Sequence, residues 1–186
     1  TEQHVHSLDK AVWLNGDAVP LACYGMGGRQ VRTGEQWGNI YDHHAVCYEF
    51  PNNVRVYSYT RQQSGCFNEV DDIVQGTKGQ ARILKFQIDG PMKWSHSGPR
   101  PSMYDVEHKE LFAALRDGKT INNGDYMTKS TMMAIMGRMA TYTGQRITWD
   151  MAMDSQLNLS PEKYEFGDVK VPGNDVIAMP GKTKFL

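Results

Sequence analysis

Apolar residues near the beginning of the chain recur with the spacing of a helix. Val5, Leu8 and Val12 lie at positions i, i+3 and i+7, which places them on one helix face. Gly16 follows, and a glycine just past the last turn commonly ends a helix because it adopts the left-handed backbone without strain. The pattern therefore predicts an amphipathic helix over residues 4–15 with one buried stripe.

The chain then changes to short segments that are typical of β-strands. The clearest pair covers residues 44–50 and 54–59, which are rich in β-branched and aromatic side chains and are joined by a turn at Pro51-Asn52-Asn53. Further strands are expected at residues 19–26, 68–74, 81–86, around 88 and at 92–95. Short strands joined by tight turns favour an antiparallel sheet.

Helical spacing returns in the second half of the chain. It predicts helices over residues 106–116 and 125–142, and Thr148 can cap a third helix at residues 149–154 through its hydroxyl group. Ser160-Pro161 has the composition of one further helical turn. One helix, a run of strands and then more helices predict an α+β fold, with an open, mostly antiparallel sheet and helices packed on one face.

Composition narrows the class of protein. The chain has 186 residues, 40% of them hydrophobic and 22% charged, which suits one globular domain or two small ones. Its net charge of −1 and the lack of a basic stripe argue against nucleic-acid binding, and its apolar runs are too short to span a membrane. Cys23, Cys47 and Cys66 share no CxxC spacing, so reduced core thiols are expected. A cytoplasmic location fits this, unless an export signal precedes residue 1.

The first helix carries the most informative set of polar residues. Glu2, His6, Asp9 and Trp13 are spaced by four, three and four residues, so they share one helix face. A carboxylate one turn before an imidazole can hold it in one tautomer while the other ring nitrogen faces a substrate hydroxyl. The same spacing also occurs on ordinary helices, where the acid caps the helix and the histidine lies at an interface. Spacing alone leaves both interpretations open.

The histidines do not predict a metal site. Glu2, His4, His6, His43 and His44 are all possible ligands. However, His4 and His6 are two residues apart on a helix and point in different directions, and neighbours in a strand face opposite sides of the sheet. Too few of these groups can converge on one ion.

Two other groups have more than one interpretation. Arg29, Arg32 and Arg61 lie at expected strand ends or in loops, where they could bind a polyol or an acidic sugar, or serve as subunit contacts or solvated surface. Gly25-Met26-Gly27-Gly28 departs from the GxGxxG pattern of dinucleotide loops because residue 30 is Gln. A bulge or bend in a strand is the better interpretation of these glycines.

The segment at Glu2, with the sequence Glu-Gln-His-Val-His-Ser-Leu-Asp-Lys-Ala-Val-Trp-Leu-Asn-Gly, resembles the start of the C-terminal domain in the Gfo/Idh/MocA oxidoreductases. These are relatives of glucose–fructose oxidoreductase and inositol dehydrogenase, and their pattern there is an acid, three residues, a histidine, an aspartate, an aromatic residue and a glycine. Six other stretches, across essentially the whole chain, resemble one branch of predicted oxidoreductases in that family. They are Gly27-Gly-Arg-Gln-Val-Arg-Thr, Tyr41-Asp-His-His-Ala-Val, Arg61-Gln-Gln, Gly76-Thr-Lys-Gly, Glu107-His-Lys-Glu-Leu-Phe and Ile121-Asn-Asn-Gly-Asp-Tyr-Met.

The resemblance implies a two-domain enzyme. An N-terminal Rossmann domain would hold NAD or NADP, and the second domain would supply the substrate pocket and build homo-oligomers through its sheet. Glu2 matches the family acid, which is usually Asp, and His6 matches the catalytic histidine. The Rossmann domain and the Glu-Lys-Pro motif are absent from these residues. Residues 1–186 are therefore interpreted as the C-terminal substrate and oligomerisation domain of a larger protein, with no cofactor expected on this chain alone.

The resemblance thus implies hydride transfer between a nicotinamide and a sugar or polyol carbon in the intact protein. His6 would take the hydroxyl proton and Glu2 would orient the imidazole. The expected substrate contacts are His4, Arg29, Arg32 and Arg61. Two alternatives stay open: a glycosidase of the same fold that uses NAD transiently, and a non-catalytic domain that only assembles dimers or tetramers.

Overall fold

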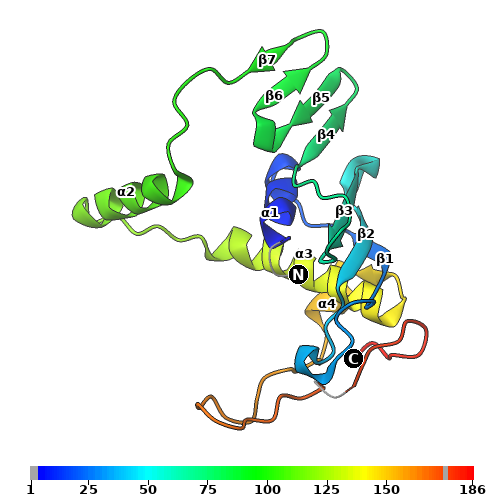
Figure 1. Cartoon of the computed structure of the whole chain (residues 1–186). Helices are drawn as coiled ribbons and strands as arrows, with labels where there is room; N and C mark the ends of the chain where they lie inside the picture. Colours follow the sequence, from blue (N-terminus) through cyan, green and yellow to red (C-terminus); the bar gives the residue numbers. More distant parts are fainter. Residues whose placement is uncertain (1–3, 174–175) are drawn as a thin grey trace. The chain divides into compact units, whose positions relative to one another are not determined.

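The structure is a computed structural model that describes residues 4–173 and 176–186, and its internal contacts divide the chain into two compact units (Figure 1). Unit 1 combines the segment that ends at Gly65 with the segment that begins at Gly124, and unit 2 is Cys66–Asn123. Every helix among the described residues is too short or too polar to cross a lipid bilayer.

Unit 1 contains an open antiparallel sheet with the strand order β3-β2-β1-β8. Its strands are β1 (Ala22–Gly28), β2 (His43–Glu49), β3 (Arg55–Arg61) and β8 (Ile147–Thr148). The predicted hairpin is confirmed: a 3-10 turn at Pro51–Asn53 joins β2 to β3, and Val46 pairs with Ser58 in the middle of the ladder. Asn52 and Asn53 have φ angles of 59° and 61°, a left-handed conformation that asparagine tolerates better than most residues.

The glycine-rich segment of β1 is neither a nucleotide-binding loop nor a bulge. Pairing with β2 continues without a break from Ala22 to Gly28, so the expectation of a bulge or bend is wrong. A Cβ atom added at Gly27 would lie 2.7 Å from the backbone oxygen of His43 and 3.3 Å from the Cβ of Thr141. Glycine occurs here because a neighbouring strand and a helix approach the backbone closely.

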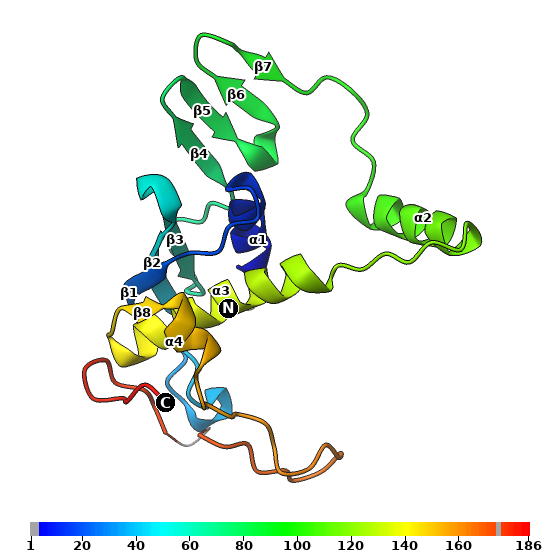
Figure 2. The same ribbon diagram turned by 180° about the vertical axis from the view of Figure 1, so that it is seen from behind.

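Helices cover one face of this sheet. They are α1 (Val5–Leu14), α3 (Gly124–Thr143) and α4 (Trp149–Met153), and α3 packs against β1 and β2 while α1 and α4 pack against α3 (Figures 1 and 2). All three helices were predicted within one or two residues of these bounds. Thr148 caps α4 as expected, since its hydroxyl accepts a hydrogen bond of 3.2 Å from the Met151 N–H. The helical turn expected at Ser160-Pro161 is absent, because an exposed single turn has no packing to offset its nucleation cost.

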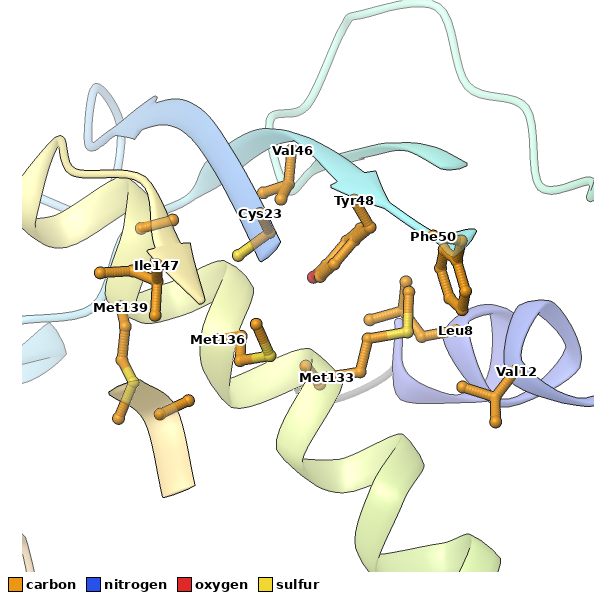
Figure 3. Packing of buried hydrophobic residues seen from close by; sticks show 13 residues of the cluster. Leu8, Val12, Cys23, Val46, Tyr48, Phe50, Met133, Met136, Met139 and Ile147 are labelled. Carbon is orange, nitrogen blue, oxygen red and sulfur yellow. The ribbon is translucent and has the colours of Figure 1, made fainter. Parts of the chain in front are cut away.

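The core of unit 1 lies between the helices and the sheet (Figure 3). Leu8 and Val12 form the predicted stripe of α1 and are 3% and 1% exposed. Met133, Met136 and Met139 of α3 also pack in this core, where the flexible methionine side chain fills irregular space. Cys23 belongs to the same cluster, and burial raises the pKa of its thiol to about 12. That thiol is a packing group and not a nucleophile. The ten labelled core residues are Leu8, Val12, Cys23, Val46, Tyr48, Phe50, Met133, Met136, Met139 and Ile147.

Unit 2 contains a second open antiparallel sheet, with the order β4-β5-β6-β7, and one helix. Its elements are β4 (Ile73–Gly76), β5 (Gly79–Arg82), β6 (Gln87–Asp89), β7 (Trp94–Ser95) and α2 (Met103–Arg116). The strand expected at 68–74 begins only at Ile73, and the one expected at 81–86 gives way after Arg82 to a 3-10 turn. Unit 2 is described throughout, and none of its residues is fully buried.

The predicted fold class is confirmed. The chain is an α+β protein with open antiparallel sheets and helices packed against a sheet. The structure differs from the expectation in having two four-stranded sheets, one in each unit.

Candidate functional site

A small polar pocket opens where the first turn of α1 and the middle of α3 cover the sheet of unit 1. Its free volume is about 20 Å³, which admits one small polar group. Leu8 and Val46 are among its apolar walls. The lining side chains that carry polar groups are His4, His44, Tyr48, Ser58, Thr60 and Arg138.

His4 ties α1 to the sheet at this pocket. It occupies the N-cap position, and its carbonyl oxygen accepts hydrogen bonds from the Ser7 and Leu8 N–H groups. Its ring Nε2 lies 2.6 Å from the Ser58 hydroxyl, which β3 places on the helix-facing side. His4 therefore lines the pocket, as a substrate contact would.

His44 is held in the same pocket as a neutral ring. Its Nδ1 lies 2.9 Å from the Thr141 hydroxyl, which itself donates to the backbone oxygens of Gly137 and Arg138. The Thr141 oxygen is thus the acceptor, so His44 carries its proton on Nδ1. Burial, together with the positive charges of neighbouring groups, Arg138 among them, lowers the pKa of His44 to about 4. At neutral pH the ring is uncharged.

Arg138 lies over an aromatic ring. Its guanidinium carbon is 4.3 Å from the centroid of the Tyr142 ring. Tyr142 is fixed in turn, because its hydroxyl donates to the Asn39 carbonyl at 3.0 Å and accepts from the Tyr41 N–H at 3.1 Å. The His44 ring stacks parallel to Tyr142 at 6.3 Å. One tyrosine therefore orders two groups of the pocket wall.

A second polar cluster lies at the beginning of β2, around Asp42. The buried Asp42 carboxylate accepts hydrogen bonds from the backbone N–H groups of Gln30, Val31 and Arg32 at 2.7, 2.8 and 3.0 Å, and from His43 Nδ1 at 2.8 Å. Although burial opposes ionisation, these hydrogen bonds hold the pKa of Asp42 well below its usual range. His43 and His44 point to opposite sides of the sheet, as their adjacency in a strand predicts.

The predicted catalytic pair is only partly described. Glu2 lies outside the described residues. His6 is exposed on the first turn of α1 and is not part of the pocket lining. On the same helix, Asp9 accepts a hydrogen bond of 2.5 Å from the Ser130 hydroxyl of α3, and Trp13 is 72% exposed. Asp9 therefore anchors the helix that carries His6.

The three arginines expected to contact substrate do not line the His4 pocket. Arg29 donates to the Gly38 carbonyl at 2.6 Å, and the Arg32 guanidinium lies 5.0 Å from the Trp37 ring centroid. Arg61 ends β3, where it pairs with His43. The structure thus separates these arginines from His4, and their role in substrate binding stays a prediction.

Sequence reasoning missed four residues of the pocket. They are His44, Ser58, Thr60 and Arg138. Two of them could have been found from the sequence. Val56, Ser58 and Thr60 are alternate residues of β3 and therefore lie on the same, buried side of the strand. Polar residues at alternate positions of a face that should be apolar are a sign of a polar site.

No protein-family model and no curated protein matches the sequence. Solved structures do match. They include an aldose-aldose oxidoreductase from Caulobacter crescentus in complex with glycerol, with a TM-score of 0.58, 17% identity, and 77% of this chain and 45% of that chain covered. The WlbA dehydrogenase from Bordetella pertussis, in complex with NADH and UDP-GlcNAcA, has a TM-score of 0.58, 18% identity, and 78% and 43% coverage.

A third match is myo-inositol 2-dehydrogenase from Lactobacillus plantarum, with a TM-score of 0.56, 16% identity, and 77% of this chain and 46% of that chain covered. The chain therefore spans a little under half of the length of the structures that it matches. At these identities the likeness shows a shared fold. The chain has the fold of one part of these Gfo/Idh/MocA-type oxidoreductases.

Proposed function

We propose that this chain is the C-terminal, substrate-binding domain of an NAD(P)-dependent oxidoreductase of the Gfo/Idh/MocA family, acting on a sugar or polyol hydroxyl. The observation that carries this proposal is the shared fold with part of three sugar or polyol oxidoreductases. The sequence from Glu2 to Asp9 supports it independently, because it repeats the family's acid, histidine and aspartate at the matching spacing.

The nicotinamide does not fit the residues described in this chain. A dinucleotide needs a glycine-rich turn between a strand and a helix, whereas Gly25–Gly28 lies inside β1 with a neighbouring strand and α3 in close contact. The part of the relatives that this chain does not cover would hold NAD or NADP, which accepts the hydride. The residues of this chain would bind the substrate and move its proton.

His6 is the proposed proton acceptor. Its exposure on α1 leaves the ring accessible to a substrate, and the Asp9–Ser130 hydrogen bond fixes the helix that presents it. As the carbinol is oxidised, the imidazole takes the hydroxyl proton. Glu2, four residues earlier in the sequence, would hold the ring in the tautomer that leaves one nitrogen free to accept.

The test uses the protein as its natural gene encodes it. Reduction of NAD and NADP is measured with a panel of sugars and polyols, including myo-inositol and aldoses. We expect substrate-dependent reduction, and His6→Ala should lower kcat/KM at least about a hundredfold, the usual contribution of a general base. The matched control is His108→Ala, another exposed helical histidine. Unchanged activity in His6→Ala would show that His6 has no catalytic role.

A role in assembly has its own support. The sheet face of unit 1 that points away from α3, called here the open face, carries Tyr24, Met26, Tyr57 and Tyr59, which are 44%, 75%, 63% and 71% exposed. Clustered exposed aromatic and methionine side chains are typical of interfaces. We propose that homo-oligomers form through this face.

Light scattering during size exclusion tests the assembly role. The protein should elute as a dimer or larger, and Met26→Lys combined with Tyr59→Lys should shift it to the monomer. A protein that assembles but shows no nicotinamide binding and no turnover would favour a purely structural domain. A monomeric parent protein would refute assembly through the open face.

A further inference from the structure

Arg138 is a half-buried cation whose charge has no partner among the residues that the structure describes. Within residues 4–173 and 176–186 its guanidinium forms no ion pair and no hydrogen bond, and it lies over the Tyr142 ring. A charged group that is removed from water is normally paired, because its desolvation is otherwise uncompensated. Its position therefore points to an anion that comes from outside these residues.

The pocket beside Arg138 has the chemistry to receive that anion. Its lining residues, all within the described ranges, include two histidines and the hydroxyl-bearing Tyr48, Ser58 and Thr60, but no aspartate or glutamate. The Thr60 hydroxyl has no hydrogen-bond partner among the described residues, so it can donate to a ligand. The Ser58 hydroxyl is engaged with His4. Arg138 thus makes the polar wall positive, and the Thr60 hydroxyl is available to a ligand.

The geometry of Arg138 favours a planar anion. The guanidinium carbon lies 4.3 Å from the Tyr142 ring centroid, and the N–H groups of a guanidinium can form two parallel hydrogen bonds to one carboxylate. The free volume of about 20 Å³ holds little more than one water-sized group, so it can take an oxygen of a carboxylate but not a sugar ring. The rest of the ligand must then lie outside the pocket.

We propose that this pocket binds the carboxylate of the substrate, with Arg138 as its main ligand and Thr60 as a second donor, so that the substrate class is a sugar acid. That the bound carboxylate belongs to the substrate rests on the proposed function. Binding of a carboxylate in this pocket, in contrast, needs no nicotinamide. At neutral pH His44 is uncharged, because burial lowers its pKa to about 4, so Arg138 supplies the charge.

The test is calorimetric titration of the full protein, without nicotinamide, with D-glucuronate, D-glucose and glucose 6-phosphate. Glucuronate should bind at least about tenfold more tightly than glucose, which is the scale of one charge-assisted hydrogen bond. Arg138→Gln should lower the affinity for glucuronate to that for glucose, and Arg138→Lys should restore part of the difference. Arg116→Gln is the matched control, because Arg116 also lies over an aromatic ring, Phe112.

Thr60→Val keeps the test decisive if Arg138→Gln fails to fold, because it removes a donor and preserves the shape of the side chain. It should weaken glucuronate binding severalfold and leave glucose unaffected. Equal affinity for glucuronate and glucose, or a preference that survives in Arg138→Gln, would overturn the proposal. Tighter binding of glucose 6-phosphate than of glucuronate would overturn the assignment to a carboxylate. Hydride transfer to neutral polyols would leave the proposed function intact even then.

Discussion

Acid should destabilise this protein through one histidine, His44. Its pKa in the folded protein is about 4, against 6.5 for an ordinary histidine, because the ring is buried beside other positive groups. Between these two values the unfolded chain binds a proton that the folded chain does not, so stability falls as pH falls through this window. The full difference corresponds to about 3 kcal/mol, of which about 2 kcal/mol is lost between pH 7 and pH 5.

His44→Asn isolates this contribution. The asparagine amide can still donate to the Thr141 hydroxyl, as Nδ1 does in the parent protein at 2.9 Å, but it does not titrate. Urea unfolding at pH 7 and pH 5 should show a loss of stability that is about 2 kcal/mol smaller in the variant than in the parent. His108→Asn, at an exposed histidine, should behave like the parent. The same pH dependence in His44→Asn and the parent would refute this reasoning.

Two further predictions concern packing and the loop before β2, and both are checked by urea unfolding at neutral pH. Asp42→Asn should lower the free energy of unfolding by about 3 kcal/mol, because the backbone N–H groups of Gln30–Arg32 lose a charged acceptor. Since the pKa of Asp42 is depressed in the folded protein, this contribution is present above about pH 4 and is lost only as pH falls towards that lower pKa. Equal stability of this variant and the parent would contradict the role of Asp42. Gly137→Ala should also destabilise, by about 1–3 kcal/mol, although alanine favours helices, because the new Cβ would lie 2.2 Å from the hydroxyl oxygen of the buried Tyr48. A more stable Gly137→Ala variant would show that Tyr48 can move away.

Periodicity predicted those elements that bury one face. The stripe of α1 and the alternation in β2 and β3 each record packing against a single neighbour, so the sequence carries a clear pattern for them. The N-cap hydroxyl of Thr148 similarly located the beginning of α4. Unit 2 was predicted less well, since none of its residues is fully buried and its short strands carry no strong alternation. The beginning of α2 was missed because its N-cap is Ser102, four residues before the expected start.

The pocket was harder to predict than the fold, for a geometric reason. Spacing along one element identified the histidines of α1, but the pocket joins residues of four elements. His44 contacts Thr141 across 97 positions of the sequence, and His4 contacts Ser58 across 54. Only the folded sheet brings such residues together. Resemblance to a family identified His6, which lies outside the pocket, and did not identify Arg138.

The central claim is that this chain presents a histidine to a carbinol whose hydride passes to a nicotinamide. Its most direct test is a single-turnover reaction of the natural full-length protein with a polyol that carries deuterium on the carbinol carbon. The account predicts that the label appears on the nicotinamide, and that His6→Ala slows this transfer at least about a hundredfold at neutral pH. Transfer at the parent rate in His6→Ala, or no label on the nicotinamide with any sugar or polyol, would contradict it.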